Sequence, residues 1–242
     1  MSSADLFFDL DRTLWDFDRN SREALAEIFH EIAQSRLRIS IGEQQFIAVY
    51  EVENERCWNA YRKGELTQSE LRPLRFQRSL EALGVEHSHE LEQVSAELGQ
   101  AYVERAPYRT ALIPGAMEVC ETLKSRGHRM FILTNGFDEV QHIKMKNSGL
   151  SPFFDQVFTS DALGHKKPAL DAFQACLYQT GSNSSRAIMI GDDLECDVNG
   201  ARLAGWRQVH FDPSEVPTDP NLWQRIRRLD ELLSLELNCI EH

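Results

Sequence analysis

The chain has 242 residues, of which 42% are hydrophobic and 26% are charged, and its formal net charge is -12. This composition is ordinary for a soluble globular protein, and the length suits one large domain or a domain with a sizeable insertion. The acidic balance and the lack of a long basic run argue against a general nucleic-acid binder, because such proteins use Lys and Arg to displace phosphate counterions. A small anionic substrate, held by a metal and a few local cations, is compatible with this charge.

Cysteine usage and the N-terminal segment favour a cytoplasmic protein. The five cysteines are dispersed without a C-x-x-C pair, which suits reduced thiols better than a disulfide framework; they are Cys57, Cys120, Cys176, Cys196 and Cys239. The segment MSSADLFFDL has no basic region followed by a long apolar one, and no window approaches the roughly 18 apolar residues of a membrane helix. We therefore expect a soluble cytoplasmic protein with no membrane and no nucleic-acid partner.

Five short apolar segments have the character of β-strands, and helical patterns that end in glycine lie between the last four. The predicted strands are Asp5–Leu10, Arg129–Thr134, Gln156–Thr159, Ala187–Gly191 and Arg207–Phe211. Alternating helix and strand predict an α/β fold, a Rossmann-like parallel sheet with helices on both faces. In such sheets the working crevice lies beyond the carboxyl ends of the strands.

The block from residue 19 to residue 106 interrupts this alternation, because it contains helical patterns and no convincing strand. Short breaks separate the helical patterns at Arg38–Gly42, Lys63–Thr67 and Gly84–Ser88. Thr67 and Glu70 have the spacing of a capping box, which predicts that a helix starts directly after Thr67. The block could form ordinary layers of one domain, but we favour an inserted all-α cap, because it separates the first strand from the others.

The predicted domains follow from this interruption. Residues 1–18 and 107–242 are expected to form the Rossmann-like core, and residues 19–106 the helical cap. A last helix is predicted to pack on the core near the C-terminus, from apolar residues at helical spacing: Leu222, Ile226, Leu229 and Leu233.

Two carboxylates end the first predicted strand. Asp9 and Asp11 are separated by one residue, so in an extended segment their side chains point to the same face. Two like charges held this close repel each other unless a cation or a shared proton relieves them. The pair therefore predicts a functional site.

Further polar residues follow three other predicted strands. Thr134 and Asn135 end the second strand, Lys167 lies in the segment after the third, and Asp192 follows the fourth. Each has a plain structural explanation, since strand-end Asp and T-N-G are common in turns and Lys-Pro is common at a helix start. A doubly wound sheet would bring all of them to one edge beside the two aspartates, and this joint placement favours an active site.

Four segments carry a family resemblance. FDLDRTL, ILTNG, KKP and IGDDLECD resemble, in order, the four signature motifs of the haloacid dehalogenase superfamily of phosphohydrolases. The resemblance covers nearly the whole chain, including a helical cap inserted soon after the first motif. It implies a Rossmann-like core, a helical cap and Mg²⁺ as the cofactor.

The resemblance assigns roles to the aspartates. Asp9 would attack phosphorus in line and form an aspartyl-phosphate, and Asp11 would protonate the leaving oxygen and then deprotonate the hydrolytic water. Mg²⁺ prefers oxygen ligands and would be held by the Asp9 carboxylate, the Asp11 backbone carbonyl and Asp192. Asp197 would order the water ligands of the metal without binding the metal itself. Asp193 is either a further metal contact or, as we favour, the cap of the following helix.

The same resemblance assigns the remaining positions. Thr134 and the backbone N–H of Asn135 would hydrogen-bond the phosphoryl oxygens, and Lys167 would neutralise the remaining charge and orient Asp9. Asp11 favours phosphoryl transfer over dehalogenation, because a halide leaving group needs no proton.

The cap narrows the expected substrate. CWNAYRKGELTQSELRPLRFQRSLEALGV, with the later LTNGFDEVQ and NSGLSPFFD, is similar to the bacterial pyrimidine 5′-nucleotidases. The expected partner is a small phosphorylated metabolite, in particular a nucleoside monophosphate. Three alternatives stay open: a sugar-phosphate phosphatase, a phosphotransferase of the β-phosphoglucomutase type and, more distantly, a non-catalytic phosphate-binding signalling module. The sequence does not distinguish a monomer from a dimer.

Overall fold

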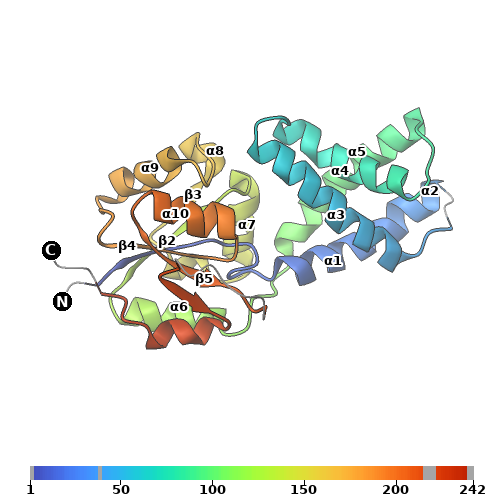
Figure 1. Cartoon of the computed structure of the whole chain (residues 1–242). Helices are drawn as coiled ribbons and strands as arrows, with labels where there is room; N and C mark the ends of the chain where they lie inside the picture. Colours follow the sequence, from blue (N-terminus) through green and yellow to red (C-terminus); the bar gives the residue numbers. More distant parts are fainter. Residues whose placement is uncertain (1–2, 38–39, 215–221, 239–242) are drawn as a thin grey trace. The chain divides into compact units, whose positions relative to one another are not determined.

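The computed structural model describes residues 3–37, 40–214 and 222–238. The chain divides into two compact units, which we call the core unit (Met1–Phe17 and Thr110–His242) and the cap unit (Asp18–Arg109). The core unit contains a sheet flanked by helices, and the cap unit is helical (Figure 1). The junctions expected from the sequence, after residue 18 and after residue 106, lie close to these divisions.

The core unit is built on a parallel sheet with the strand order β3-β2-β1-β4-β5-β6. Its strands are β1 (Asp5–Phe8), β2 (Arg129–Thr134), β3 (Gln156–Thr159), β4 (Ala187–Gly191), β5 (Arg207–Phe211) and β6 (Gln224–Ile226). The predicted α/β fold is confirmed, as are the five predicted strands, although β1 ends at Phe8 instead of Leu10. The short strand β6 was not predicted, because Gln224 and Arg225 leave it without an apolar run.

The predicted C-terminal helix is wrong. Leu222 lies outside any helix, Ile226 ends β6, and Leu229–Ser234 forms a separate 3₁₀-helix. Ile226 and Leu229 nevertheless enter the same apolar cluster of the core unit. A strand and a short helix thus bury two of the four residues that the helical spacing had suggested, whereas Leu222 and Leu233 are half-buried. Periodicity over so few residues does not distinguish a helix from these structures.

Helices cover both faces of the sheet (Figure 1). Helices α6 (Ala116–Ser125) and α7 (Asp138–Asn147) contribute to the apolar cluster that contains Leu6 and Phe8. Helices α9 (Leu170–Thr180) and α10 (Gly200–Leu203) contribute to the cluster that contains Phe7. Alternate side chains of β1 therefore enter opposite clusters, as in a strand that is buried on both faces. Two short helices lie near the carboxyl edge of the sheet, α8 (Ser160–Leu163) and the π-helix Leu194–Asn199, and the 3₁₀-helix Ser151–Phe153 precedes β3.

Where the structure describes the cap unit, its secondary structure is helical, and aliphatic and aromatic side chains fill its interior. The long helices are α1 (Phe17–Ile28), α3 (Glu43–Arg62), α4 (Gln68–Ala82) and α5 (His89–Arg105), with the π-helix Phe29–Gln34, α2 (Ser35–Leu37) and the 3₁₀-helix Ala106–Tyr108 between and after them. The rings of Phe29 and Phe46 lie 4.8 Å apart, as do those of Tyr50 and Phe76. The predicted capping box at Thr67 is confirmed: its hydroxyl accepts the backbone N–H of Glu70, whose carboxylate accepts the backbone N–H of Thr67.

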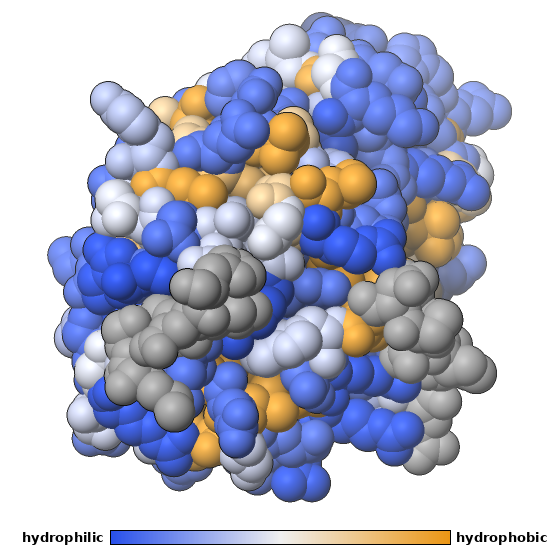
Figure 2. All heavy atoms as spheres, turned by 60° about the vertical axis from the view of Figure 1, so that its left-hand side comes forward, coloured by the Kyte–Doolittle hydropathy of each residue, from blue (hydrophilic) through white to orange (hydrophobic). Residues whose placement is uncertain are grey.

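The surface of the protein is mostly polar on the face seen in Figure 2, where hydrophobic residues form small groups between hydrophilic ones. Within the described ranges, no helix has both the length and the apolar character that crossing a bilayer requires. Cys239 lies outside the described residues, and the other four cysteines are buried free thiols.

Candidate active site

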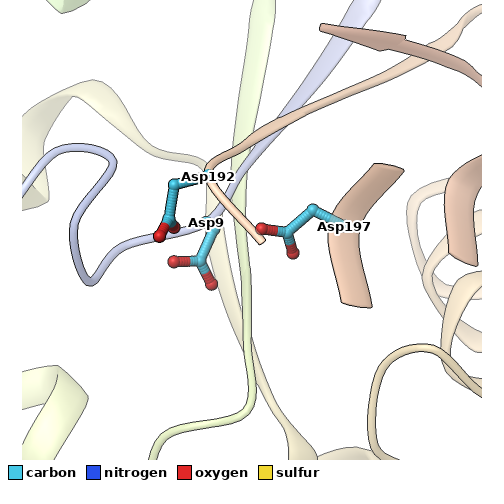
Figure 3. A group of neighbouring side chains, drawn as sticks. All are labelled: Asp9, Asp192 and Asp197. Atoms are coloured by element: carbon cyan, nitrogen blue, oxygen red, sulfur yellow. The ribbon is translucent and has the colours of Figure 1, made fainter. Parts of the chain in front are cut away.

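The carboxyl ends of the central strands bring the predicted aspartates together. The backbone N–H of Asp9 donates to the carbonyl oxygen of Ile190 on β4, so the chain stays in register just beyond Phe8. Asp192 follows β4 directly, and Asp197 lies in the π-helix after it. One carboxylate oxygen from each of Asp9, Asp192 and Asp197 lies within 4.8 Å of the others, and Figure 3 shows the three side chains converging.

Lys167 lies in the same group, with its side chain 2% exposed. Its Nζ donates to Asp9 Oδ1 at 2.7 Å, to Asp197 Oδ1 at 2.6 Å and to the carbonyl oxygen of Leu133 at 2.6 Å. These bonds use all three donors of the ammonium. Burial alone would lower the pKa of Lys167, but the carboxylates of Asp197 and Asp9 outweigh it and hold the pKa above its usual value.

The three carboxylates carry more negative charge than Lys167 balances. Burial raises the pKa of Asp9 well above its usual value, the charges of Asp197 and Asp192 raise it further, and Lys167 opposes them. Burial together with the charge of Asp197 raises the pKa of Asp192 to about 7, although Arg12 opposes the shift. Burial likewise raises the pKa of Asp197. A divalent cation bound by oxygen would relieve this repulsion, so the donor set fits Mg²⁺.

Hydrogen bonds divide the aspartates into two kinds. Asp9 bonds through Oδ1 to Lys167, and Asp192 accepts the Thr13 hydroxyl through Oδ1 at 3.2 Å. Among the described residues, neither Oδ2 has a hydrogen-bond partner, so Asp9 and Asp192 each keep an oxygen for a metal. Asp197, by contrast, accepts the backbone N–H of Asp193 through Oδ2 at 3.1 Å and Lys167 through Oδ1. The Asp197 carboxylate therefore holds Lys167 and the backbone of Asp193 in place.

Two features of the loop after β4 hold Asp197 in place. A Cβ at Gly191 would lie 2.1 Å from Asp197 Oδ2, so only glycine admits this carboxylate against the strand end. The side chain of Asp193 accepts the backbone N–H groups of Glu195 and Cys196 at 2.9 and 2.8 Å, which makes it the cap of the π-helix. This geometry supports the cap interpretation of Asp193 over a metal contact.

Thr134 and Asn135 lie at the end of β2, beside β1. The Thr134 hydroxyl accepts the backbone N–H of Gly136 at 3.1 Å, which closes the T-N-G turn. The Asn135 side chain bonds the backbone of Lys167 twice, donating to its carbonyl at 2.9 Å and accepting its N–H at 2.8 Å. Asn135 thus fixes the Lys167 segment, whose peptide bond to Pro168 is cis, to the end of β2.

The Asp11 side chain does not join the other aspartates. Both of its carboxylate oxygens are bonded by α7: Lys144 Nζ donates to Oδ1 at 2.6 Å and to Oδ2 at 2.8 Å, and Gln141 Nε2 donates to Oδ2 at 3.0 Å. Sequence reasoning missed Gln141 and Lys144. The available signal was their spacing of three residues on a helix that starts directly after T-N-G, which turns both toward the strand ends.

Two further contacts were missed on the side of Asp192. Thr13 is fully buried and bonds the Asp192 carboxylate, and it is the threonine of D-x-D-x-T. His210 on β5 places Nε2 3.0 Å from the carbonyl oxygen of Asp192. Only the first of these two residues lies in a recognisable motif; His210 follows from the parallel register of β4 and β5.

Comparison with known proteins gives this geometry a family. Over 94% of its length the chain is 29% identical to the HAD-hydrolase YfnB of Bacillus subtilis, covering 92% of that protein. A crystal structure of YfnB bound to magnesium superposes with a TM-score of 0.83, covering 97% of this chain and 98% of that one. The chain is also 33% identical to a ribulose-1,5-bisphosphate 5-phosphatase of Halopiger xanaduensis, over 87% of this chain and 85% of that protein.

A third relative is named as a member of the enzyme group that the cap sequence resembles. The pyrimidine 5′-nucleotidase YjjG of Escherichia coli is 29% identical, over 85% of this chain and 86% of that protein. The family model described as haloacid dehalogenase-like hydrolase matches residues 6–205, which include the four motifs and the whole cap unit. The chain therefore belongs to the haloacid dehalogenase-like hydrolases.

Proposed function

We propose that this hydrolase is a Mg²⁺-dependent phosphomonoesterase that acts through an aspartyl-phosphate, with pyrimidine nucleoside 5′-monophosphates as its substrates. One observation carries the proposal: Asp9, at the end of the central strand, is buried against Lys167 and beside Asp192, with one carboxylate oxygen unbonded by the described residues. A nucleophile needs such an accessible oxygen, and a phosphoryl group needs the adjacent cations.

Each residue then has a defined task in two displacements. Asp9 attacks phosphorus while the bond from phosphorus to the leaving oxygen breaks, and Asp11 gives that oxygen a proton. A water molecule then attacks the phosphorus of the aspartyl-phosphate, Asp11 takes the water's proton, and the bond from Asp9 to phosphorus breaks. Asp9, the backbone carbonyl of Asp11 and Asp192 would hold Mg²⁺, which supplies positive charge against the phosphoryl oxygens.

The remaining residues position the phosphoryl group. Thr134 and the backbone N–H of Asn135 hydrogen-bond its oxygens at the end of β2, and Lys167 balances its charge while holding Asp9 in orientation. Asp197 keeps Lys167 and the loop after β4 in place. The only partner that this mechanism requires is a small phosphorylated metabolite, and we place the enzyme in the cytoplasm, where its buried free thiols would stay reduced.

The relatives support two substrate classes. YjjG is named a pyrimidine 5′-nucleotidase and matches 85% of this chain, which supports a nucleoside monophosphate. The Halopiger xanaduensis relative is named a ribulose-1,5-bisphosphate 5-phosphatase and supports a sugar phosphate as the second candidate. The aspartyl-phosphate chemistry is the same in both cases, so the two candidates differ only in the leaving group.

Phosphate release from a panel of nucleoside monophosphates and sugar phosphates tests the proposal. We expect release to require added Mg²⁺, to stop with EDTA, to favour pyrimidine nucleotides, and to be abolished in the variant Asp9→Asn. Preference for sugar phosphates would keep the mechanism and replace the substrate. Accumulation of a bisphosphorylated sugar with little free phosphate would instead identify a phosphotransferase, and appreciable turnover by folded Asp9→Asn would remove Asp9 as the nucleophile.

A further inference from the structure

Asp11 has to be held in a fixed place if it is to protonate a leaving group, and helix α7 holds it. Gln141 is fully buried and Lys144 is 5% exposed. They lie three residues apart and therefore on the same face of α7. Together they donate three hydrogen bonds to the Asp11 carboxylate, between 2.6 and 3.0 Å.

These hydrogen bonds leave one lone pair of the Asp11 carboxylate without a donor from α7. A carboxylate has about four lone-pair positions, two on each oxygen. Oδ2 accepts from Lys144 and from Gln141, whereas within the described part of the chain Oδ1 accepts from Lys144 alone. The second lone pair of Oδ1 is thus the position on this carboxylate that the side chains of α7 leave unbonded. The Asp11 side chain is 25% exposed, so its neighbours do not enclose it completely.

Lys144 is itself held by aromatic rings. Its Nζ lies 4.4 Å from the centroid of the Trp15 ring and 5.8 Å from that of Phe17. Trp15 is fully buried, so this part of the surrounding is rigid. Ring faces attract an ammonium, so these rings help to keep Lys144 directed at Asp11, its one carboxylate partner among the residues that the structure describes.

Gln141 links the same network to the T-N-G turn after β2. Its Nε2 donates to the Thr134 hydroxyl at 2.8 Å as well as to Asp11. A Cβ at Gly136 would lie 2.1 Å from Gln141 Nε2, so the glycine of T-N-G leaves the space that this amide occupies. The turn that presents Thr134 and the helix that holds Asp11 are therefore fitted to each other.

We infer that Lys144, assisted by Gln141, is a positioning residue that aims the Asp11 carboxyl at the leaving oxygen of the substrate. This inference rests on the proposed function, because it gives Lys144 a task only if Asp11 is the proton donor. It differs from a merely structural role in one measurable way. Misplacing the proton donor slows the departure of a basic alkoxide, but not the departure of a leaving group that needs no proton.

The experiment compares kcat/KM for a nucleoside 5′-monophosphate and for p-nitrophenyl phosphate. For both substrates kcat/KM reports the steps through departure of the first product, and p-nitrophenolate departs without a proton. We expect Lys144→Met to lower kcat/KM for the nucleotide about 10²-fold, the size of a typical general-acid contribution, and to leave kcat/KM for p-nitrophenyl phosphate unchanged. Lys146→Met is the matched control, because Lys146 is an exposed lysine on the same helix.

Asp11→Asn separates the two ways in which the idea can fail. If Asp11→Asn slows both substrates equally, the proposed proton donor is wrong. If Asp11→Asn discriminates between the substrates and Lys144→Met does not, the inference about Lys144 is wrong. A uniform loss in Lys144→Met would reduce it to a structural residue. Should Lys144→Met fail to fold, Lys144→Gln keeps a donor with shorter reach and is expected to show the same discrimination to a smaller degree.

Discussion

The core unit buries charged groups, whereas the cap unit keeps most of its ion pairs at the surface. Asp5, Lys144 and Lys167 of the core unit are at most 5% exposed, and each is bonded to an opposite charge. In the cap unit, the pairs Arg19–Glu23 and Arg36–Glu97 leave at least 39% of each side chain exposed. Burying a charge is costly unless it is paired and hydrogen-bonded. The core unit buries charged residues in the candidate site and at the start of β1. We therefore expect substitutions of these residues to lower activity or stability more than substitutions of the exposed pairs in the cap unit.

Arg75 qualifies the comparison, because it is a cap-unit charge with only 4% exposure. Its guanidinium lies 4.6 Å from the centroid of the Tyr102 ring, and its Nη1 donates to Asn54 at 3.1 Å. Ring faces and an amide solvate this cation. The cap unit thus relies mainly on a cluster of aliphatic and aromatic side chains, whereas the core unit adds buried ion pairs to its apolar clusters.

Lys167 should give the largest effect of the buried charges. Lys167→Ala removes the ammonium that bonds Asp9 and Asp197, and we expect kcat to fall about 10²- to 10³-fold, as when a preorganised donor is lost from a transition state. Steady-state phosphate release measures this. Lys166→Ala is the matched control, since Lys166 precedes it in the chain but lies outside the aspartate group, and it should keep the parent kcat. A Lys167→Ala enzyme with normal kinetics would remove Lys167 from the site.

Asp5 tests the structural use of a buried charge at the opposite end of β1. The Asp5 carboxylate accepts Arg129 Nη2 at 2.5 Å, Arg129 Nε at 2.8 Å and the Ser182 hydroxyl at 2.5 Å. We expect Asp5→Ala to lower the free energy of unfolding by about 3 kcal/mol, because it leaves partly buried guanidinium groups unpaired. Urea denaturation measures the loss. Glu23→Ala breaks an exposed pair of the cap unit and should cost below about 1 kcal/mol; equal losses would contradict the comparison.

The same carboxylate makes stability depend on pH. Burial would raise the pKa of Asp5, but the hydrogen bonds from Arg129 and Ser182 and the charge of Arg129 outweigh it and hold the pKa below its usual value. A lowered pKa in the folded state means that the ionised form stabilises the fold at neutral pH and that this stabilisation is lost as the pH falls below about 5. The difference in unfolding free energy between the parent and Asp5→Ala should therefore shrink in acid.

Thr67 should give a smaller effect, because it acts on one helix end of the cap unit. Its hydroxyl bonds the carboxylate of Glu70 at 2.7 Å, and its backbone N–H donates to the same carboxylate at 2.8 Å. We expect Thr67→Ala to cost about 1 kcal/mol, the usual value for loss of an N-cap side chain. Thr67→Ser keeps the hydroxyl and should recover most of the loss. If both variants lose the same amount, the capping box is not what stabilises the start of α4.

The elements of the fold differ in how well the sequence predicts them. The strands β1 to β5 and the cap at Thr67 were predicted because each depends on a short local pattern, an apolar run or a capping pair. The positions of Asp9, Asp192 and Lys167 relative to one another followed from the rule that parallel strands end at one edge. By contrast, β6 was missed and a helix was expected there, because three half-polar residues join the sheet only through pairing with β5.

Tertiary contacts explain what was missed in the site. Lys144 looks like a solvated residue of a surface helix, and only the folded chain shows its ammonium between Asp11 and the ring of Trp15. His210 gives no local signal either, since its contact with Asp192 depends on the register of β5 against β4. Residues that act through strand ends were therefore predictable, whereas for Lys144 the spacing along α7 was the available signal and its partners became evident only in the folded chain.

His87 should give the smallest effect, because it is an exposed group between α4 and α5 of the cap unit. Its Nδ1 lies 2.9 Å from Glu81 Oε1, and this hydrogen bond, with further attraction from Glu92, raises the pKa of His87 above its usual value. A raised folded-state pKa means that any stabilisation is present at pH values below the unfolded pKa and is lost as the pH rises through the folded pKa. NMR titration of the imidazole should show the raised pKa, and Glu81→Gln should lower it. Because exposed charges are screened by salt, the pKa shift of His87 should also become smaller at high ionic strength. A pKa shift that persists at high salt would mean that His87 is shielded from solvent ions. The contrast between exposed charges in the cap unit and buried charges in the core unit would then be weaker.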